Sequence, residues 1–342
     1  MSGDRVLITG ATGAIAKWCA VEALKAGYRV RGTVRSAARA GEVAAAVASQ
    51  GADASRLEIV VADLLSDAGW AEAMRDCRYV LHVASPFPLV LPKDYDELIR
   101  PARDGTLRVL KAAEAAGVEH VVMTSSVVAI MYPASGEQSR IYDESDWTDP
   151  RRPDLTAYIA SKALAERAAW EYVTEKSRRR WLSVINPGLV LGPAIDRDLS
   201  SSHAILKAMA RGSYPAAPGA GYPIADVRDV AKAHVRALTA PAAAGERLVV
   251  AEGYLTLMQL SKILARERPR LRWRLPWLVL HDGFVRLYSR FDPRLRAVLA
   301  DLGATRRVSN AKAQAALDMR FRSADEAVVS AIQSLDALGV LG

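Results

Sequence analysis

The sequence is poor in the features that build cross-links or membrane spans. Its 342 residues include only two cysteines, Cys19 and Cys77, far apart and outside any C-x-x-C pair. This excludes a disulfide framework and a cysteine-based metal site, and it is typical of a reducing compartment. Apolar runs stop well short of the ~20 residues that cross a bilayer, and the N-terminus shows no signal-peptide pattern. We therefore expect a cytoplasmic protein with no metal site and no membrane partner.

The sequence also has fewer acidic than basic residues. The chain has 46 Lys and Arg against 38 Asp and Glu, a net charge of +8, with basic clusters at 178–180 and 266–274. Such clusters can bind nucleic acid. No recognised nucleic-acid motif accompanies them, and the first cluster falls where a helix should end, a place that favours cations. We interpret the charge as solvated surface and expect no nucleic-acid partner.

What the sequence does contain is a regular alternation of β-branched runs and alanine-rich stretches. Strands are expected at 5–10, 28–35, 57–64, 79–85, 120–126 and 181–188. Helices are expected near 14–26, 37–50, 66–76 and 98–117. This alternation predicts an α/β fold of the Rossmann type, a doubly wound parallel sheet covered by helices on both faces.

The pattern changes after residue 190. Proline and glycine become frequent at 214–223, and helices are expected at 227–239, 256–267 and 276–290, with two short helices in 309–338. We expect a sheet domain over 1–190, with return elements near 225–250. A smaller, mostly helical C-terminal lobe over 191–342 would cover the carboxyl edge of the sheet, where open α/β sheets bind ligands.

A glycine-rich turn follows the first strand. In LITGATGAIAKW the spacing is GxxGxxA, with Gly10, Gly13 and Ala16. The first glycine permits a tight turn, the second lets backbone amides approach a pyrophosphate, and the small alanine lets helix and strand pack closely. The residues expected to hold a dinucleotide here are Gly10, Thr12, Gly13, Ala14 and Ile15.

The end of the second strand lacks the acid that an NAD site uses to hold the ribose hydroxyls. In GTVRSAAR, Arg35 and Ser36 take its place, and Arg39 follows one turn later. A guanidinium suits the 2′-phosphate of NADP(H). We therefore expect NADP(H) as the cofactor of the domain over 1–190.

The later strands also end in residues that suit a cofactor site. Asp63 follows the third strand, where its carboxylate can accept from the adenine amine, and Ser85 follows the fourth. Ser126 follows the fifth, where it can donate to a substrate oxygen. The cofactor set expected at the third and fourth strand ends is Asp63, Leu64, Val83, Ala84 and Ser85.

Tyr158 and Lys162 lie four residues apart in TAYIASKALAE, so a helix would place them on one face. A neighbouring ammonium favours the phenolate and lowers the pKa of the tyrosine. A surface Tyr–Lys pair without function is common, and this spacing alone does not distinguish the two. Together with Ser126 the pair completes a Ser–Tyr–Lys set in chain order.

With these residues in place, the sequence resembles the extended short-chain dehydrogenase/reductase superfamily. Within it, the chain looks like the dihydroflavonol 4-reductase-like group of aldehyde and ketone reductases. The resemblance covers roughly residues 5–240 and is carried by ITGATGAIA, VRGTVRS, VLHVASPF, VVMTSSV, YIASKALAE and NPGLVLGP.

The resemblance implies the catalytic roles. Tyr158 would be the general acid, Lys162 would lower its pKa and bind the nicotinamide ribose, and Ser126 would polarise the carbonyl. The remaining cofactor contacts that it implies are Thr124, Pro187, Gly188, Leu189, Val190 and Ser202.

Two departures from the plant flavonoid reductases bear on the substrate. Their asparagine five residues beyond the catalytic serine is Met131 here, and a pocket glutamine aligns with Pro223, which disfavours a polyhydroxylated flavonoid. The cinnamoyl-CoA reductase signature around the tyrosine is also missing. Pocket candidates are Phe87, Met131, Tyr132, Leu189, His203 and Tyr222, which suggest an apolar or aromatic carbonyl substrate, although ordinary core packing would explain each of them.

Two other functions stay open. One is sugar-nucleotide epimerase or dehydratase chemistry, disfavoured by Arg35 and by the absence of acids beside Ser126. The other is a non-catalytic NADP sensor, disfavoured because Tyr158 and Lys162 are both kept. Many members of the resembled group dimerise through the helices that here span 98–117 and 157–176, and others are monomers; of these two alternatives we expect the homodimer.

Overall fold

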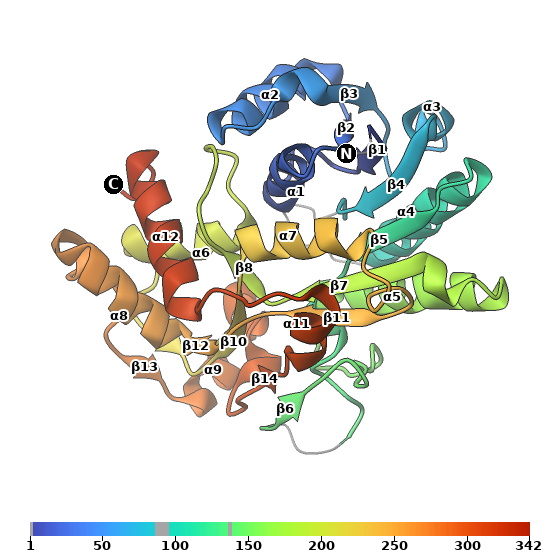
Figure 1. Cartoon of the computed structure of the whole chain (residues 1–342). Coiled ribbons are helices and arrows are strands. Elements are labelled where there is room, and N and C mark those ends of the chain that lie inside the picture. Colours follow the sequence, from blue (N-terminus) through green and yellow to red (C-terminus); the bar gives the residue numbers. More distant parts are fainter. Residues whose placement is uncertain (1–2, 86–95, 136–138) are drawn as a thin grey trace.

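The computed structural model describes residues 3–85, 96–135 and 139–342, and its centre is a seven-stranded parallel sheet (Figure 1). The strands are β1 (Arg5–Ile8), β2 (Arg29–Val34), β3 (Leu57–Val61), β4 (Cys77–His82), β5 (His120–Thr124), β7 (Leu182–Pro187) and β11 (Arg247–Val250). Their order is β11-β7-β5-β4-β1-β2-β3. The direction of winding reverses between β1 and β4, so a crevice opens there at the carboxyl edge. The predicted Rossmann-type fold is confirmed.

Helices cover both faces of this sheet. One face carries α1 (Ala14–Lys25), α2 (Ala40–Ser49), α7 (Val227–Ala237) and α11 (Ala311–Leu317). The other carries α3 (Trp70–Met74), α4 (Asp96–Ala115) and α5 (Ala157–Glu175). Because helices cover both faces, every residue of β5 and β7 is buried, whereas a half-exposed strand would alternate buried and exposed residues.

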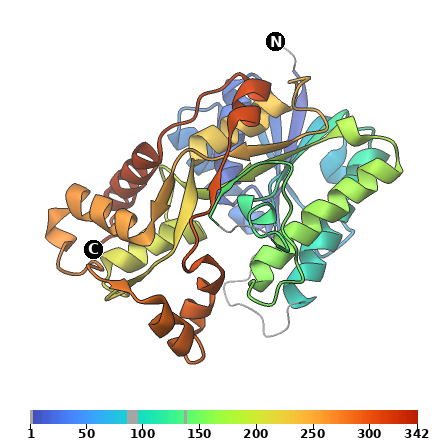
Figure 2. The same cartoon turned by 90° about the horizontal axis from the view of Figure 1, so that it is seen from below.

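The smaller lobe has a core of its own. A three-stranded sheet of β8 (Leu189–Leu191), β10 (Gly221–Asp226) and β12 (Tyr254–Thr256) packs with α6 (Ser201–Ala210), α8 (Leu257–Glu267) and α12 (Ala324–Ala337). Thr256 and Ser323 each close a capping box with the residue three positions on, which fixes where α8 and α12 begin. Figure 2 shows this lobe beside the sheet domain, in yellow to red.

The chain returns to the large sheet after entering the lobe. Strand β11 pairs with β7, α7 packs against α1, and Leu317 of α11 lies in the same core as α1. The domain boundary at residue 190 stays a prediction. No helix within the described ranges is both long and apolar enough to cross a bilayer.

Two expected helices were wrong in extent, and one helix was not expected. The helix predicted over 66–76 is only α3, because Gly69 has φ of +85° and a Cβ there would lie 2.4 Å from the Val61 carbonyl oxygen. Within 276–290 the chain forms β13 (Val279–Leu280), which pairs with β9 (Ala217–Pro218), and only then α9 (Asp282–Tyr288). The sequence did not predict α6 (Ser201–Ala210) at all.

Short elements complete the fold: β6 (Ile141–Tyr142), β14 (Arg307–Val308) and α10 (Pro293–Arg296).

Candidate active site

The glycine-rich turn joins β1 to α1 at the crevice. Gly10 has φ of +66°, and a Cβ there would lie 2.9 Å from the Ala84 Cβ, so the close approach of β1 and β4 requires glycine. Gly13 precedes α1 and provides no side-chain cap. Thr12, Ala14 and Ile15 are partly exposed beside it. Uncapped amides at this helix start fit the pyrophosphate of a dinucleotide.

Two arginines after β2 differ in how they are engaged. Arg39 is bonded to Asp198 at 2.6 Å and to Glu42 at 2.9 Å. Arg35 is exposed and makes no hydrogen bond or ion pair with any residue that the structure describes. The Arg35 guanidinium is therefore free to meet a phosphate, and no carboxylate stands at the end of β2. These residues fit NADP(H).

The ends of β3 and β4 line the same edge. Asp63 is partly exposed, and its Oδ1 accepts from the Leu65 amide at 3.0 Å. Leu64 is likewise partly exposed, as are Val83, Ala84 and Ser85 after β4. The Ala84 amide donates to Thr9 Oγ1, which bonds His82. Burial, with Lys162 adding to it, lowers the pKa of His82 to about 3, so a neutral imidazole fixes this edge.

Ser126, Tyr158 and Lys162 converge at the carboxyl edge. Ser126 follows β5, and its Oγ accepts from the Val128 amide at 3.3 Å. Thr156 caps α5, which places Tyr158 in the first turn and Lys162 in the second. The side chains of Ser126 and Tyr158 share a hydrogen bond. The arrangement gives one hydroxyl pair with a cation one helical turn away.

The net pKa shift of Tyr158 is opposite to the one expected from the sequence. Burial raises the pKa of the Tyr158 phenol, and the hydrogen bond from Ser126 lowers it by less. Burial also lowers the pKa of Lys162 to about 8, against the raising effect of Glu166. The expectation that Lys162 sets a lowered tyrosine pKa is therefore wrong here, because desolvation of the phenolate dominates.

The sequence did not predict a buried hydrogen-bond network that lies one helical turn beyond Lys162. Glu166 lies four residues beyond Lys162 and accepts from Ser125 Oγ at 2.5 Å, Asn186 Nδ2 at 2.8 Å and Arg247 Nε at 2.5 Å. The same Asn186 Nδ2 lies 3.2 Å from the Ser126 carbonyl oxygen. The network ties α5 to β5, β7 and β11. The i+4 spacing of Glu166 was visible, but its partner 81 residues away was not.

Thr124 at the end of β5 and the 187–190 stretch at the end of β7 lie at the same carboxyl edge of the sheet. Thr124 Oγ1 is 2.6 Å from His234 Nε2, and His234 Nδ1 is 2.7 Å from the Val230 carbonyl oxygen. A carbonyl oxygen only accepts, so His234 donates through Nδ1, and because burial lowers its pKa to about 4 the neutral ring accepts the Thr124 proton at Nε2. At Gly188 a Cβ would meet the Pro223 carbonyl oxygen at 2.4 Å. Pro187 ends β7, and Leu189 and Val190 are partly exposed in β8.

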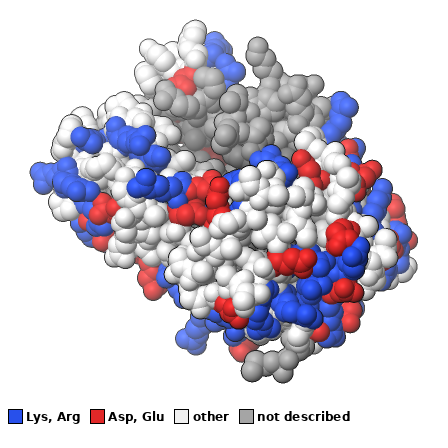
Figure 3. Space-filling view, turned by 90° about the horizontal axis from the view of Figure 1, so that it is seen from above, with Lys and Arg blue, Asp and Glu red and all other residues white. Residues whose placement is uncertain are grey.

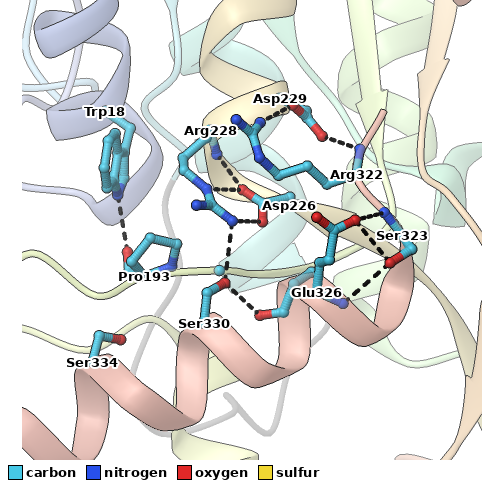
Figure 4. Close-up of polar contacts among 12 residues, drawn as sticks. Trp18, Pro193, Asp226, Arg228, Asp229, Arg322, Ser323, Glu326, Ser330 and Ser334 are labelled. Atoms are coloured by element: carbon cyan, nitrogen blue, oxygen red, sulfur yellow. Dashed lines mark hydrogen bonds and ion pairs between the residues drawn. The ribbon is translucent and has the colours of Figure 1, made fainter. Parts of the chain in front are cut away.

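The loop between β8 and α6 crosses the start of α1 (Figure 4). The Trp18 indole donates to the Pro193 carbonyl oxygen at 3.0 Å, and Lys17 pairs with Asp196 at 2.6 Å. Ser334 of α12 accepts from the Ala194 amide at 2.8 Å. Figure 4 also shows Arg228 bonded to Asp226 and to Ser330 of α12. The C-terminal helix therefore holds this loop beside the glycine-rich turn.

Two further predicted residues lie in or beside that loop. Ser202 is buried in the first turn of α6. His203 bonds the Gly192 carbonyl oxygen and Ser200 Oγ, each at 2.8 Å, and lines a small cavity with Ala14 and Lys17. Both of its ring nitrogens are thus engaged within the protein.

Two of the remaining substrate candidates, Tyr132 and Tyr222, meet at Asp301, which the sequence did not single out. The Tyr132 hydroxyl donates to Asp301 Oδ1 at 2.8 Å, and Tyr222 also hydrogen-bonds Asp301. Burial raises the pKa of Asp301 to about 6. Met131 is buried in the adjacent core. Phe87 lies outside the described residues.

Comparison with known proteins identifies the family. The NAD dependent epimerase/dehydratase family matches residues 6–251, and the chain belongs to it. Cinnamoyl-CoA reductase 1 of Petunia hybrida is 36% identical over 273 residues, covering 79% of each chain. Ketoreductase azaE of Aspergillus niger is 31% identical and covers 97% of each chain. Dihydroflavonol 4-reductase of Zea mays is 36% identical over 61% of this chain and 59% of its own.

Comparison with solved structures supports the same family. Yeast methylglyoxal/isovaleraldehyde reductase Gre2, complexed with NADPH, superposes with a TM-score of 0.78 at 26% identity, covering 98% of this chain and 99% of its own. Gre2 of Candida albicans with NADPH gives a TM-score of 0.79 at the same identity and coverage. The resemblance to dihydroflavonol 4-reductase-like members of the extended short-chain dehydrogenase/reductases is confirmed.

Proposed function

We propose that the protein is an NADPH-dependent reductase that converts an aldehyde, ketone or keto ester, apolar or aromatic in character, into an alcohol. The observation that carries this proposal is the hydrogen-bonded Ser126–Tyr158 pair, with Lys162 one helical turn away at the carboxyl edge of the sheet. The coarser class, an oxidoreductase of the reductase type, follows from the family and its relatives. The NADPH in the Gre2 structures and the free Arg35 support the cofactor.

In this proposal, residues at different strand ends contact different parts of the cofactor. The uncapped amides at the start of α1, just after the Gly10–Gly13 turn, would hold the pyrophosphate, and Arg35 the 2′-phosphate. Asp63 would accept from the adenine amine and Lys162 would hydrogen-bond the nicotinamide ribose. When bound, NADPH supplies the hydride that reaches the carbonyl carbon.

The protein's own part of the reaction is to supply one proton and stabilise one developing charge. Burial keeps the Tyr158 phenol protonated, so its Oη–H can pass a proton to the carbonyl oxygen as the alkoxide forms. Ser126 Oγ donates a hydrogen bond to the same oxygen and stabilises its charge. Lys162, with a pKa of about 8, is mainly cationic at neutral pH, and its charge would offset part of the desolvation cost of the phenolate that remains, although that cost dominates the pKa of Tyr158.

The test follows absorbance at 340 nm with NADPH and a panel of aromatic aldehydes, ketones, keto esters and one dihydroflavonol. Tyr158→Phe should lower kcat by about 10²–10⁴-fold, the usual contribution of a general acid, while NADPH binding measured by fluorescence is retained. Tyr172→Phe, which removes another hydroxyl from α5, is the matched control and should keep full activity. Retained turnover in Tyr158→Phe would refute the assigned acid, and no turnover of any carbonyl by the wild type would refute the reductase assignment.

A further inference from the structure

The large apolar side chains that the structure leaves exposed gather in one stretch of the lobe. Of eleven such side chains among the described residues, eight lie between 273 and 291. Trp273, Trp277 and Phe291 are 73%, 81% and 80% exposed. The others are Leu278, Val279, Phe284, Leu287 and Tyr288. We call residues 272–291 the lobe segment; such clustering in one segment marks an interaction surface rather than scattered surface apolarity.

The same segment carries positive charge without compensating acids. Arg272, Arg274, Arg286 and Arg290 are exposed and form no ion pair with the described residues, and Asp282 is the only acid in the segment. Arg268 and Arg270, just before it, are by contrast paired with Asp336. Figure 3, which views the side opposite to Figure 2, shows Lys and Arg side chains over the lobe at the left, with Asp and Glu side chains beside them.

The segment is firmly attached at its base. Leu271, Leu275 and Val285 are buried, and Ser261 Oγ donates to the Pro276 carbonyl oxygen at 2.8 Å. On the outer side, Phe284 stacks on Tyr288 with ring centroids 4.2 Å apart. Figure 2 shows β13 and α9, in orange, along the outer edge of the lobe. The apolar side chains therefore project from an ordered support.

We propose that the lobe segment binds the surface of an anionic lipid bilayer. Tryptophan and tyrosine rings favour the headgroup level of a membrane, and arginines bind lipid phosphates there. Leu278, Val279 and Leu287 can enter the acyl boundary, which stabilises binding in proportion to the apolar area buried. The expectation of no membrane partner rested on the lack of a spanning helix, and interfacial binding requires none.

Other occupants fit the segment less well. A second copy bound through a twofold axis would bring the same arginines face to face. A nucleic acid would satisfy the arginines but offers no apolar phase to the exposed aliphatic side chains. Both remain distinguishable outcomes of the test.

The test uses flotation of the full-length protein with vesicles of phosphatidylcholine alone or mixed with phosphatidylglycerol. We expect binding only to the anionic vesicles, weakened by added salt. Acrylamide quenching should fall on binding, because Trp273 and Trp277 are the exposed tryptophans and the other five are buried or half-buried. Arg286→Gln with Arg290→Gln should weaken binding about 30-fold, from ~1 kcal/mol per arginine.

The apolar contribution needs its own variant. Trp273→Ser with Trp277→Ser should weaken vesicle binding at least about tenfold, since each ring buries more than a methylene's worth of apolar area. Ile141→Ser, and Lys111→Gln with Arg320→Gln, are exposed controls elsewhere that should bind as the wild type does. Circular dichroism and NADPH oxidation in solution should be unchanged in all variants.

Two results would overturn the proposal: no binding to anionic vesicles at low salt, or equal binding by the segment variants and the controls. A dimer in sedimentation that Trp273→Ser with Trp277→Ser dissociates would assign the segment to a second copy. RNA binding with the same sensitivity, without vesicle binding, would assign it to nucleic acid.

Discussion

At the scale of the residue, the proposed contact with the 2′-phosphate of NADPH depends on which guanidinium has no partner within the protein. Arg35 and Arg39 lie one turn apart, yet Arg39 is held by Asp198 and Glu42 while Arg35 has no partner among the described residues. An arginine already bonded to carboxylates gains little from a phosphate, because it must first give up those bonds. The sequence shows both residues but not this difference.

Arg35→Gln should therefore raise the KM for NADPH about 10–100-fold, the equivalent of losing a charge-assisted hydrogen bond of ~1.5–3 kcal/mol. The KM for NADH should change little. Steady-state kinetics at 340 nm with both cofactors would measure this. Arg39→Gln is the matched control, with a smaller effect expected, and an effect equal to that of Arg35→Gln would contradict the assignment.

At the scale of the element, α5 carries the proposed catalytic residues on one face. Tyr158, Lys162 and Glu166 recur at intervals of four, so they lie above one another along the helix. The last of them is fully buried and bonded to Arg247 of β11, which also donates to the Glu144 carbonyl oxygen at 2.9 Å. A buried ion pair of this kind costs desolvation, and breaking one half of it leaves an uncompensated charge.

Glu166→Gln should lower the free energy of unfolding by about 3–5 kcal/mol, because Arg247 loses its buried carboxylate. It should also lower the pKa of Lys162 further, since Glu166 raises it. Urea denaturation measures the first effect and the alkaline limb of the pH–rate profile the second. Glu171→Gln, on the exposed side of the same helix, should leave both near wild type. Equal stability of the two variants would refute this role of Glu166.

At the scale of the whole molecule, Asp301 connects segments that are distant in sequence. Its carboxyl bonds Tyr132, 169 residues away, and Tyr222 of β10, and Arg306 lies 3.4 Å from Oδ1. These contacts join the segment before β14 to the segment that follows β5 and to the lobe sheet. The homodimer through α4 and α5 stays a prediction.

The pKa of Asp301 predicts a pH-dependent stability. In the native protein it is about 6 against an ordinary 3.8, so the folded state binds more protons than the unfolded state between those values. Stability relative to the non-titrating Asp301→Asn variant should therefore fall as pH rises from about 4 to 6, by on the order of 3 kcal/mol in total. Urea denaturation from pH 4 to 8 measures the difference.

A second variant tests the cause of that fall. The hydrogen bond from Tyr222 lowers the pKa of Asp301, so in Tyr222→Phe the fall should extend to higher pH. A difference between wild type and Asp301→Asn that does not change with pH would show that Asp301 is not the titrating group.

The sequence by itself determined the sheet, the glycine-rich turn and the Ser126, Tyr158 and Lys162 set, because these depend on local periodicity and on residues at strand ends. It missed α6 and the true extent of α9, where pairing of β13 with β9 interrupts the helical pattern. Only the tertiary structure decided the partners of Glu166 and Asp301, and the direction of the Tyr158 pKa. Burial and long-range hydrogen bonds arise when distant segments pack together, and no local pattern records which segments will meet.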